Sequence, residues 1–239
     1  MATRWSPRLF RWHRWLGYLV AWQVLAWVVG GVLFAWVPFQ AWVKAGDVLA
    51  PATEPLPSQW PQALARAQLP DTPVLALSSV STAAGPAWKL RTAQGEHWLD
   101  AQGAPLAAPD ATAIARYAQQ RYRGDGRLQA VERLAEVGPR WGIVRELGER
   151  REVWVARFDD TLSTRFYLDA RSGELLAARN DAWVLYDFFW RLHVMDYRGG
   201  EDFNNPLLRA AALLALGLVA VGVVMLLLAL RRHWRRPRG

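Results

Sequence analysis

Two long stretches of the chain contain no charged side chain, and they lie near opposite ends of it. The first covers residues 16–39 and is 24 residues long, and the second covers residues 210–230 and is 21 residues long. About 20 helical residues cross the hydrocarbon core of a bilayer, so each stretch predicts a membrane-spanning helix. We expect these helices at residues 15–42 and 205–230. The first stretch is too long for the apolar part of a signal peptide, which predicts that it is retained.

Between the two stretches, one sequence pattern occurs twice. Residues 98–108 read WLDAQGAPLAA and residues 167–178 read YLDARSGELLAA, which predicts a repeated strand-turn-strand unit. A helical segment precedes each copy, at residues 60–68 and 110–122, and alternating apolar residues predict further strands. In the second copy the alternating positions are Val153, Val155, Phe158, Thr164, Phe166 and Leu168. We therefore expect a membrane α protein that carries an α+β domain, in which a helix packs on an antiparallel sheet twice.

The other segments complete the predicted organisation. A proline-rich linker occupies residues 43–58, and the two helix-and-sheet units occupy residues 59–108 and 109–180. Residues 181–200 are rich in aromatic side chains. They predict an amphipathic helix on the outer membrane surface, capped by Asp181 and ended by a pair of glycines.

Arginine is concentrated in two short segments that flank the apolar stretches. Residues 1–14 and 231–239 hold nine arginines and no acid, and the totals of 29 basic and 21 acidic residues leave 20 against 21 for the rest. Basic residues mark the cytoplasmic side of a span, so we expect both segments to be cytoplasmic tails and the domain between the spans to be exported. Because the excess charge lies only beside the membrane, the sequence argues against nucleic-acid binding. Asn205 and Pro206 are a favourable cap and first residue for the second helix.

Cysteine and tryptophan restrict the chemistry further. The chain has no cysteine and 15 tryptophans. Thiolate metal sites, iron–sulfur clusters and disulfides are therefore excluded. Trp12 and Trp36 fit interfacial aromatic belts at the two ends of the first span. Trp22 and Trp27 lie deeper, and we expect them to pack against a partner helix or a flat cofactor.

Three segments carry a resemblance to a known family. Residues 153–181, VWVARFDDTLSTRFYLDARSGELLAARND, resemble a PepSY domain. Residues 183–197, WVLYDFFWRLHVMDY, and residues 11–17, RWHRWLG, are similar to the PepSY-associated membrane-helix family. The resemblance implies a bacterial inner-membrane protein whose exported domain, here two PepSY-like units, is periplasmic. The chain has two predicted spans, whereas larger members have about four.

The resemblance also implies two functions of different classes. Some members reduce ferric iron or ferric siderophores and bind haem b through membrane histidines. On this reading the chain is a haem b membrane oxidoreductase that moves electrons across the inner membrane to ferric iron or ferric chelates in the periplasm, assisting iron uptake. Other members have no known role, and soluble PepSY domains are regarded as peptidase inhibitors. The alternative is therefore a non-catalytic, membrane-anchored PepSY module that binds or regulates a partner.

Haem ligation would depend on histidine, of which the chain has four: His13, His97, His193 and His233. From the residues alone, His13 is either a ligand or one more interfacial basic residue, and the family resemblance favours haem iron ligation. Gly17, one turn further along, would leave room for a porphyrin. His193 is the second predicted axial ligand, with Phe189 and Trp190 on its face of the amphipathic helix, and its alternative is a hydrogen-bonded surface histidine.

The predicted positions of these histidines favour a homodimer. A 24-residue span separates its ends by roughly 35 Å, so His13 at the cytoplasmic end and His193 at the outer end cannot bind one iron. A two-fold axis along the membrane normal would pair each histidine with its copy and would form a four-helix bundle among the lipids. Asp187 and Asp196 are candidates for docking ferric iron outside, or are solvated acids. No flavin or nicotinamide motif is present, so a separate cytoplasmic electron donor is expected.

Overall fold

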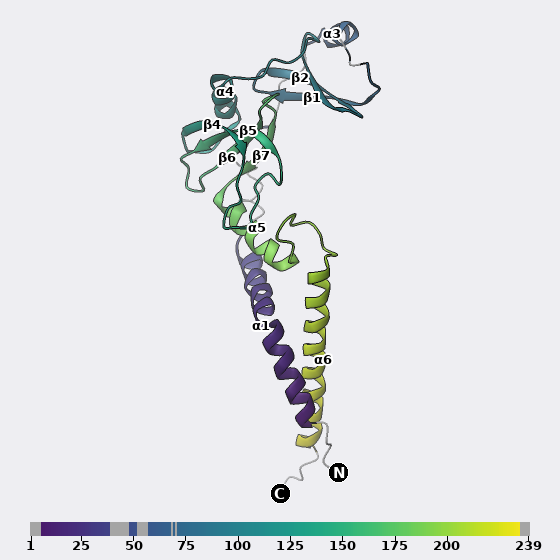
Figure 1. The fold of residues 1–239 in the computed structure, drawn as a ribbon. Coiled ribbons are helices and arrows are strands. Elements are labelled where there is room, and N and C mark those ends of the chain that lie inside the picture. Colours follow the sequence, from purple (N-terminus) through teal and green to yellow (C-terminus); the bar gives the residue numbers. More distant parts are fainter. Residues whose placement is uncertain (1–5, 39–47, 52–56, 68, 70, 235–239) are drawn as a thin grey trace. The chain divides into compact units, whose positions relative to one another are not determined.

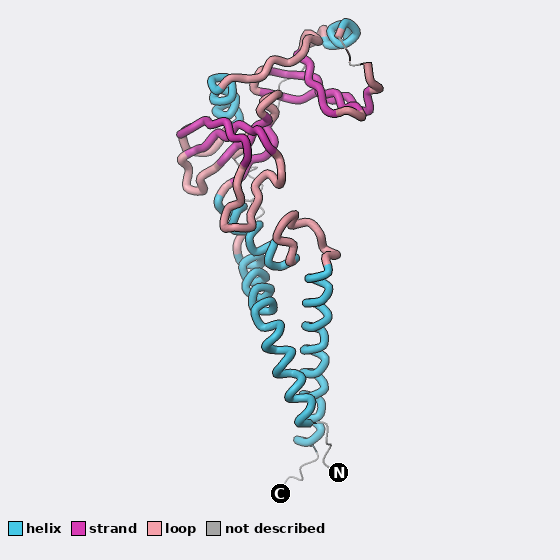
Figure 2. The backbone as a smooth tube through the Cα atoms, in the orientation of Figure 1, coloured by secondary structure: helices cyan, strands magenta, loops and turns pink. Residues whose placement is uncertain are grey.

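The computed structural model describes residues 6–38, 48–51, 57–67, 69 and 71–234 (Figure 1). The chain divides into two compact units, Met1–Val37 with Asp187–Gly239, and Pro38–Tyr186. The first unit contains two long helices, and the second contains two antiparallel sheets with short helices (Figure 2). The predicted combination of two long apolar helices with an α+β domain is confirmed.

The two long helices are α1, Ser6–Trp36, and α6, Pro206–Trp234. Within them, Pro7–Trp36 and Pro206–Arg231 are long and apolar enough to span a bilayer, with mean hydropathies of 1.9 and 3.0. Their large apolar side chains point outward: Leu19 is 69% exposed and Leu213 is 70% exposed. Exposing a continuous apolar surface to water is unfavourable, and lipid removes that cost.

The ends of α1 differ from the predicted span. The helix begins at Ser6, nine residues before the predicted start, because arginine is a good helix former and the helix continues beyond its uncharged part. Its last residue is Trp36, and Pro38, which has no N–H to donate, follows. The predicted residues 39–42 of the span lie outside the described residues, as does most of the linker.

The start of α6 agrees with the sequence. The backbone N–H of Leu208 donates to Asn205 Oδ1 over 2.8 Å, and Pro206 is the first helical residue. The predicted cap is therefore confirmed. The helix continues to Trp234, so residues 231–234 of the predicted tail are helical.

Close contacts at three glycines show that α1 and α6 pack antiparallel. A Cβ atom built on Gly17 lies 3.9 Å from Leu218, and one built on Gly217 lies 3.8 Å from Leu16. A Cβ atom on Gly222 lies 3.3 Å from His13. Small residues at such positions let helix backbones approach closely inside a membrane.

The second repeat forms the larger half of the α+β unit. It consists of α4 (Ala111–Arg121), β4 (Leu128–Glu136), β5 (Arg151–Phe158), β6 (Arg165–Asp169) and β7 (Leu175–Arg179), with the strands in the order β4-β5-β6-β7. Asp110 caps α4 by accepting from the N–H of Ala113 over 2.7 Å. The buried side chains of Ile114 and Tyr117 pack with Phe158 and Phe166 and form the core between α4 and the sheet.

The first repeat has the same order of elements but a smaller core. It consists of α3 (Trp60–Arg66), β1 (Val74–Thr82), β2 (Gly85–Thr92) and β3 (Gly95–Asp100), with the strands in the order β1-β2-β3. Trp88, Leu90 and Leu99 are its buried residues. In place of a strand corresponding to β7, this repeat has a single antiparallel β-bridge between Leu99 and Pro105.

The repeated sequence forms the same turn in both copies. Asp100 Oδ1 accepts from the N–H groups of Gln102 and Ala104, both over 2.9 Å. Asp169 Oδ1 accepts from the N–H groups of Arg171 and Ser172, also over 2.9 Å. Gly103 and Gly173 close the turns with φ of +87° and +69°, values that favour glycine. The aspartate turn is thus present in both copies, one residue longer in the second. A strand follows it in the second copy, and a single bridge follows it in the first.

Helix α5, Asp181–Val194, is shorter than the predicted helix and has a different cap. The side chain of Asn180, not that of Asp181, accepts from the N–H of Trp183 over 2.8 Å. The helix ends before Met195, whose φ is +54°, a left-handed conformation that stops a helix. The prediction that it continues to residue 200 is therefore wrong, because the chain turns before the two glycines.

Candidate functional site

His13 lies in the contact between α1 and α6. Its ring is half-buried, and a Cβ atom on Gly222 would lie 3.3 Å from its Cε1 and 3.8 Å from its Nδ1. Nδ1 is fully buried and has no hydrogen-bond partner. Among the described residues, Nε2 makes no hydrogen bond, and it is not fully buried. A neutral imidazole in this arrangement has only Nε2 available to an external ligand.

The space beside Gly17 is occupied within the chain. Leu218 Cδ1 lies 3.9 Å from the position of a Gly17 Cβ atom, which is ordinary van der Waals contact. The prediction that Gly17 leaves room for a porphyrin therefore does not hold, because Gly17 faces α6. The small residue that makes room at His13 is Gly222.

His193 is exposed and lies near the end of α5, between two tryptophans. Its ring stacks on that of Trp190, with centroids 6.3 Å apart and planes at 14°, and Trp27 lies 6.1 Å away at 53°. Trp27 Nε1 donates to the backbone oxygen of His193 over 2.8 Å, and Gln23 Nε2 donates to that of Leu192 over 2.8 Å. These two donors from α1 satisfy terminal carbonyls of α5.

The contacts with Trp27 change the expected separation of the two histidines. Trp27 lies nine residues before the end of α1, so His193 lies beside the helix and not beyond its outer end. From His13 to Trp27 is 14 residues, or about 21 Å along the axis. The separation is smaller than the one expected from the sequence, yet it still prevents both rings from ligating one iron.

Phe189, one turn before His193 on α5, packs against α1. Its Cδ1 atom lies 3.7 Å from the position of a Gly30 Cβ atom. The other aromatic residue predicted beside His193 is Trp190, whose ring stacks with that of the histidine. Trp190 is itself fixed, since its Nε1 donates to the backbone oxygen of Gly200 over 3.0 Å.

Asp187 is part of a buried ion pair. Arg191 Nε donates to Asp187 Oδ2 over 2.5 Å, and the two residues are 3% and 8% exposed. Arg191 also donates to the backbone oxygen of Arg198 over 2.9 Å. The carboxylate of Asp187 is thus used within the protein, which removes it as a docking ligand for ferric iron.

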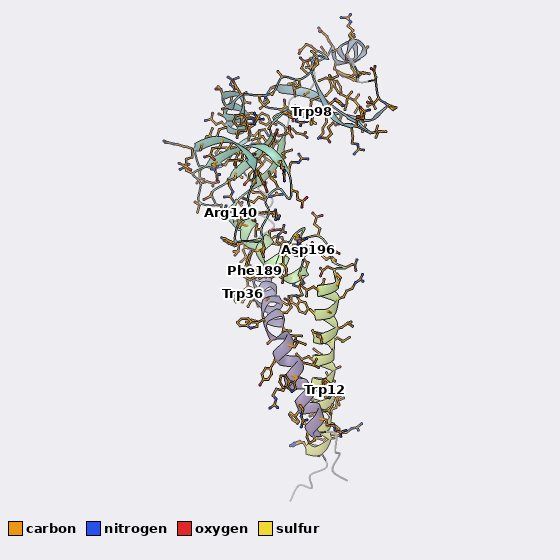
Figure 3. The ribbon with its side chains drawn as sticks, in the orientation of Figure 1. Trp12, Trp36, Trp98, Arg140, Phe189 and Asp196 are labelled. Carbon is orange, nitrogen blue, oxygen red and sulfur yellow. The ribbon has the colours of Figure 1, made fainter. Side chains whose placement is uncertain are left out.

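Asp196 organises the loop between α5 and α6 (Figure 3). Its carboxylate accepts the backbone N–H groups of Arg198, Gly199, Glu201 and Asp202 over 3.0–3.2 Å. Desolvation, the largest single influence, raises the pKa of Asp196, but the four N–H donors together lower it from 3.8 to about 2. Asp196 therefore holds this loop in place through its carboxylate.

The other two histidines are both exposed. His97 lies in β3, and His233 lies near the end of α6. Within the described ranges, no group of three or more His, Asp or Glu side chains is arranged to hold a metal ion. A porphyrin iron needs only one or two axial protein ligands, so this observation does not bear on haem.

The α+β unit contains a second cluster of polar groups. Arg165 donates to Glu146 Oε1 over 2.8 Å and to Asp181 Oδ1 over 2.9 Å, and Tyr167 donates to Glu146 Oε2 over 2.8 Å. Burial and the Glu146 carboxylate raise the pKa of Tyr167. A cavity of about 620 Å³ lies beside these residues and Arg140. The buried groups satisfy one another, as expected for a structural network.

Sequence reasoning missed Gln23 and the specific pairing of Gly222 with His13. An amide side chain inside an otherwise apolar span is a recognisable signal, because an unpaired amide in lipid is costly. Gly222 was recognisable only as one of several small residues in its helix. Which of them faces His13 depends on the antiparallel register, which the sequence does not reveal.

The comparison with known families agrees with this architecture. The model of the family described as PepSY-associated TM region matches residues 10–239. The chain belongs to the PepSY-associated TM region family. The match includes both long helices and the α+β unit, so the PepSY-associated TM protein is membrane-associated, as its two apolar helices also indicate. No curated protein and no solved structure matches the chain.

Proposed function

We propose that this PepSY-associated TM protein is a haem b oxidoreductase that moves electrons across the bacterial inner membrane to ferric iron or a ferric chelate in the periplasm. The observation that carries the proposal is the His13 ring, whose Nδ1 is buried without a partner beside Gly222 in an apolar helix pair. An ionisable group without a partner is costly in lipid, and such residues in membrane helices commonly mark functional sites. When bound, haem supplies one-electron redox chemistry.

The residues present fit axial ligation at two separate places. The His13 ring offers Nε2, since its Nδ1 is buried in the helix contact, and the exposed His193 ring lies near Trp27 and Trp190. Each place has a single histidine per chain, so a symmetric homodimer would complete two bis-histidine sites and a four-helix bundle. Asp187 and Asp196 are engaged within the protein, and the proposal assigns them no iron. Electrons would come from a separate cytoplasmic donor.

The test compares histidine variants of the full chain, purified from haem-replete cells. His13→Ala and His193→Ala should each lower the haem content per chain, measured from the Soret absorbance, because each removes an axial ligand. His233→Ala and His97→Ala are matched controls at exposed positions and should retain the haem of the parent. Helical circular dichroism of every variant separates loss of haem from loss of fold.

The same proteins then test the proposed activity in proteoliposomes with an enclosed reductant and an external ferric chelate. We expect His13→Ala to abolish reduction of the external iron and His233→Ala to preserve it. Parent protein that contains no haem, or His13→Ala protein that keeps both haem and activity, would contradict the proposal. The first of these results would favour the non-catalytic PepSY binding or regulatory module.

A further inference from the structure

We propose that the free edge of β1 binds the β1 edge of a second copy of the same chain, so that two three-stranded sheets join into one. The inference concerns the α+β unit alone and does not require haem. It rests on the homodimer of the proposed function and adds a contact between the two copies outside the apolar helices.

The edge of β1 is open over most of its length. β1 is the terminal strand in the order β1-β2-β3, and no other strand of the described ranges pairs with its free side before Thr82. The end of the strand is held, since Thr82 bridges to Glu174 and Tyr117 donates to the backbone oxygen of Ser81 over 3.0 Å. Residues 74–79 are exposed. A row of unpaired backbone groups therefore remains.

This edge also carries apolar side chains. Leu75 is 63% exposed and Leu77 is 44% exposed. Leu77 pairs with Leu90, a buried residue of the small core, so it extends the apolar face of the sheet beyond β2. α3 contacts the core through Trp60 and Leu64, but the exposure of Leu77 shows that α3 does not bury this extension.

The internal repeat provides a comparison within the same protein. β4 is the corresponding edge strand of the second repeat, and its sequence LQAVERLAE includes Glu132, Arg133 and Glu136. Charged side chains of this kind protect natural edge strands against pairing with another chain. The sequence of β1, VLALSSVST, has no charge at all. One copy of the repeat thus has a protected edge and the other has an unprotected one.

The lack of charge favours a second copy as the occupant. In a symmetric antiparallel pair, each residue lies opposite the same segment of its partner, so any charge in the centre would meet a like charge and destabilise the pair. An uncharged strand with Ser78 and Ser79 in its middle avoids this repulsion and provides hydroxyl groups across the join. A different protein would be selected through complementary charges, which β1 lacks.

Membrane anchoring makes so small a contact sufficient. One strand pair buries less than the roughly 1,000 Å² that a stable interface between soluble proteins needs. Two chains held in one membrane meet at a high effective concentration, which strengthens a weak contact without adding area. The helices and β1 would therefore stabilise the same dimer together.

The absence of cysteine allows a direct test in membranes that contain the full chain. Single substitutions Ala76→Cys, Leu77→Cys, Ser78→Cys and Ser79→Cys are oxidised with a copper catalyst, and self-disulfides are read as a doubled mass. Residues opposite one another in an antiparallel pair have Cβ atoms about 5 Å apart, near disulfide distance. We expect one or two adjacent positions to cross-link and the others to cross-link weakly. Gln129→Cys and Ala135→Cys, exposed on β4, are the matched controls and should stay monomeric.

A charge exchange at Leu77 supplies the second measurement. Leu77→Lys or Leu77→Glu, each added to whichever of Ala76→Cys, Ser78→Cys and Ser79→Cys cross-links best, should lower the cross-linked fraction roughly two- to fivefold. Co-expression of the lysine variant with the glutamate variant should restore the cross-linked fraction, because opposite charges then face each other across the strand pair. The proposal is overturned if β1 and β4 positions cross-link equally, if β1 positions cross-link only to a chain of another mass, or if none cross-links. Because the readout needs no haem, loss of haem with retained cross-linking would contradict only the proposed function.

Discussion

At the scale of single residues, Asp196 shows how one carboxylate determines the path of the chain. It lies two residues after the end of α5, and the four backbone N–H groups that donate to it hold the loop that leads to α6. Asn205 continues this arrangement by donating to the backbone oxygens of Val194 and Asp202. The loop therefore fixes where α6 begins relative to α5.

The lowered pKa of Asp196 leads to a prediction about acid. Because the pKa is lower in the folded protein than its ordinary 3.8, the carboxylate stabilises the fold above pH 4, and this contribution is lost as the pH falls toward about 2. Asp196→Asn should therefore lower the midpoint of thermal unfolding at pH 6, and the difference from the parent should vanish near pH 2. Glu201→Gln, on the same loop, is the control and should show no such difference. An equal effect of Asp196→Asn at both pH values would show that the charge is not responsible.

The residues at the candidate site were only partly predictable. His13 and His193 stood out because they lie in the two segments that resemble the membrane-helix family, RWHRWLG and WVLYDFFWRLHVMDY. The partners of Asp187 and Asp196 did not follow from the sequence. Asp187 pairs with Arg191 one helical turn later, and Asp196 binds backbone N–H groups. In the sequence both residues look like solvated acids. Their use within the protein depends on where α5 ends.

At the scale of elements, the fit between α1 and α6 depends on small residues at defined heights. A Cβ atom built on Gly222 would lie 3.3 Å from the His13 ring. A Cβ atom built on Gly217 would lie 3.8 Å from Leu16, which is an ordinary contact distance. Both glycines lie on α6 and face α1. They therefore differ mainly in how much space is left for a side chain at each position.

This difference predicts unequal effects of enlarging the two glycines. Gly222→Val should displace the His13 ring and destabilise the helix pair by about 1–3 kcal/mol, the usual cost of overpacking. Gly217→Ala should be neutral or slightly stabilising, because alanine favours helix and the distance allows a methyl group. Thermal unfolding of both variants in the same detergent, followed by helical circular dichroism, measures the difference. Equal midpoints would contradict the packing described for His13.

The elements themselves were largely predictable, for identifiable reasons. Both long helices follow from uncharged stretches, and the two sheets follow from the repeated aspartate turn at Asp100 and Asp169. The end of α5 was not predictable, because the two glycines after it suggested a later stop and Met195 gives no sign of a left-handed conformation. Contacts with Gln23 and Trp27 made the shorter helix favourable.

At the scale of the whole molecule, the two apolar helices are staggered. Gly222 lies beside His13 and Leu218 beside Gly17, so at this register the first residue of α6 is level with about residue 29 of α1. The part of α1 beyond that level has no α6 beside it. α5 packs there instead, with Phe189 on Gly30. A short third helix thus completes the apolar contacts of a protein with two candidate spans.

The distribution of arginine predicts the orientation of this assembly. Nine arginines in residues 1–14 and 231–239 should keep both segments in the cytoplasm, which places the α+β unit in the periplasm. Single cysteines in the otherwise cysteine-free chain report this directly. In intact spheroplasts, a membrane-impermeant maleimide should label Gln94→Cys, in the exposed turn between β2 and β3, and should leave Trp234→Cys unlabelled until the membrane is opened. Both positions are exposed, so labelling of both after detergent treatment shows that access, and not burial in the protein, makes the difference. Immediate labelling of Trp234→Cys, or protection of Gln94→Cys, would reverse the orientation and remove the periplasmic site of ferric reduction from the proposal.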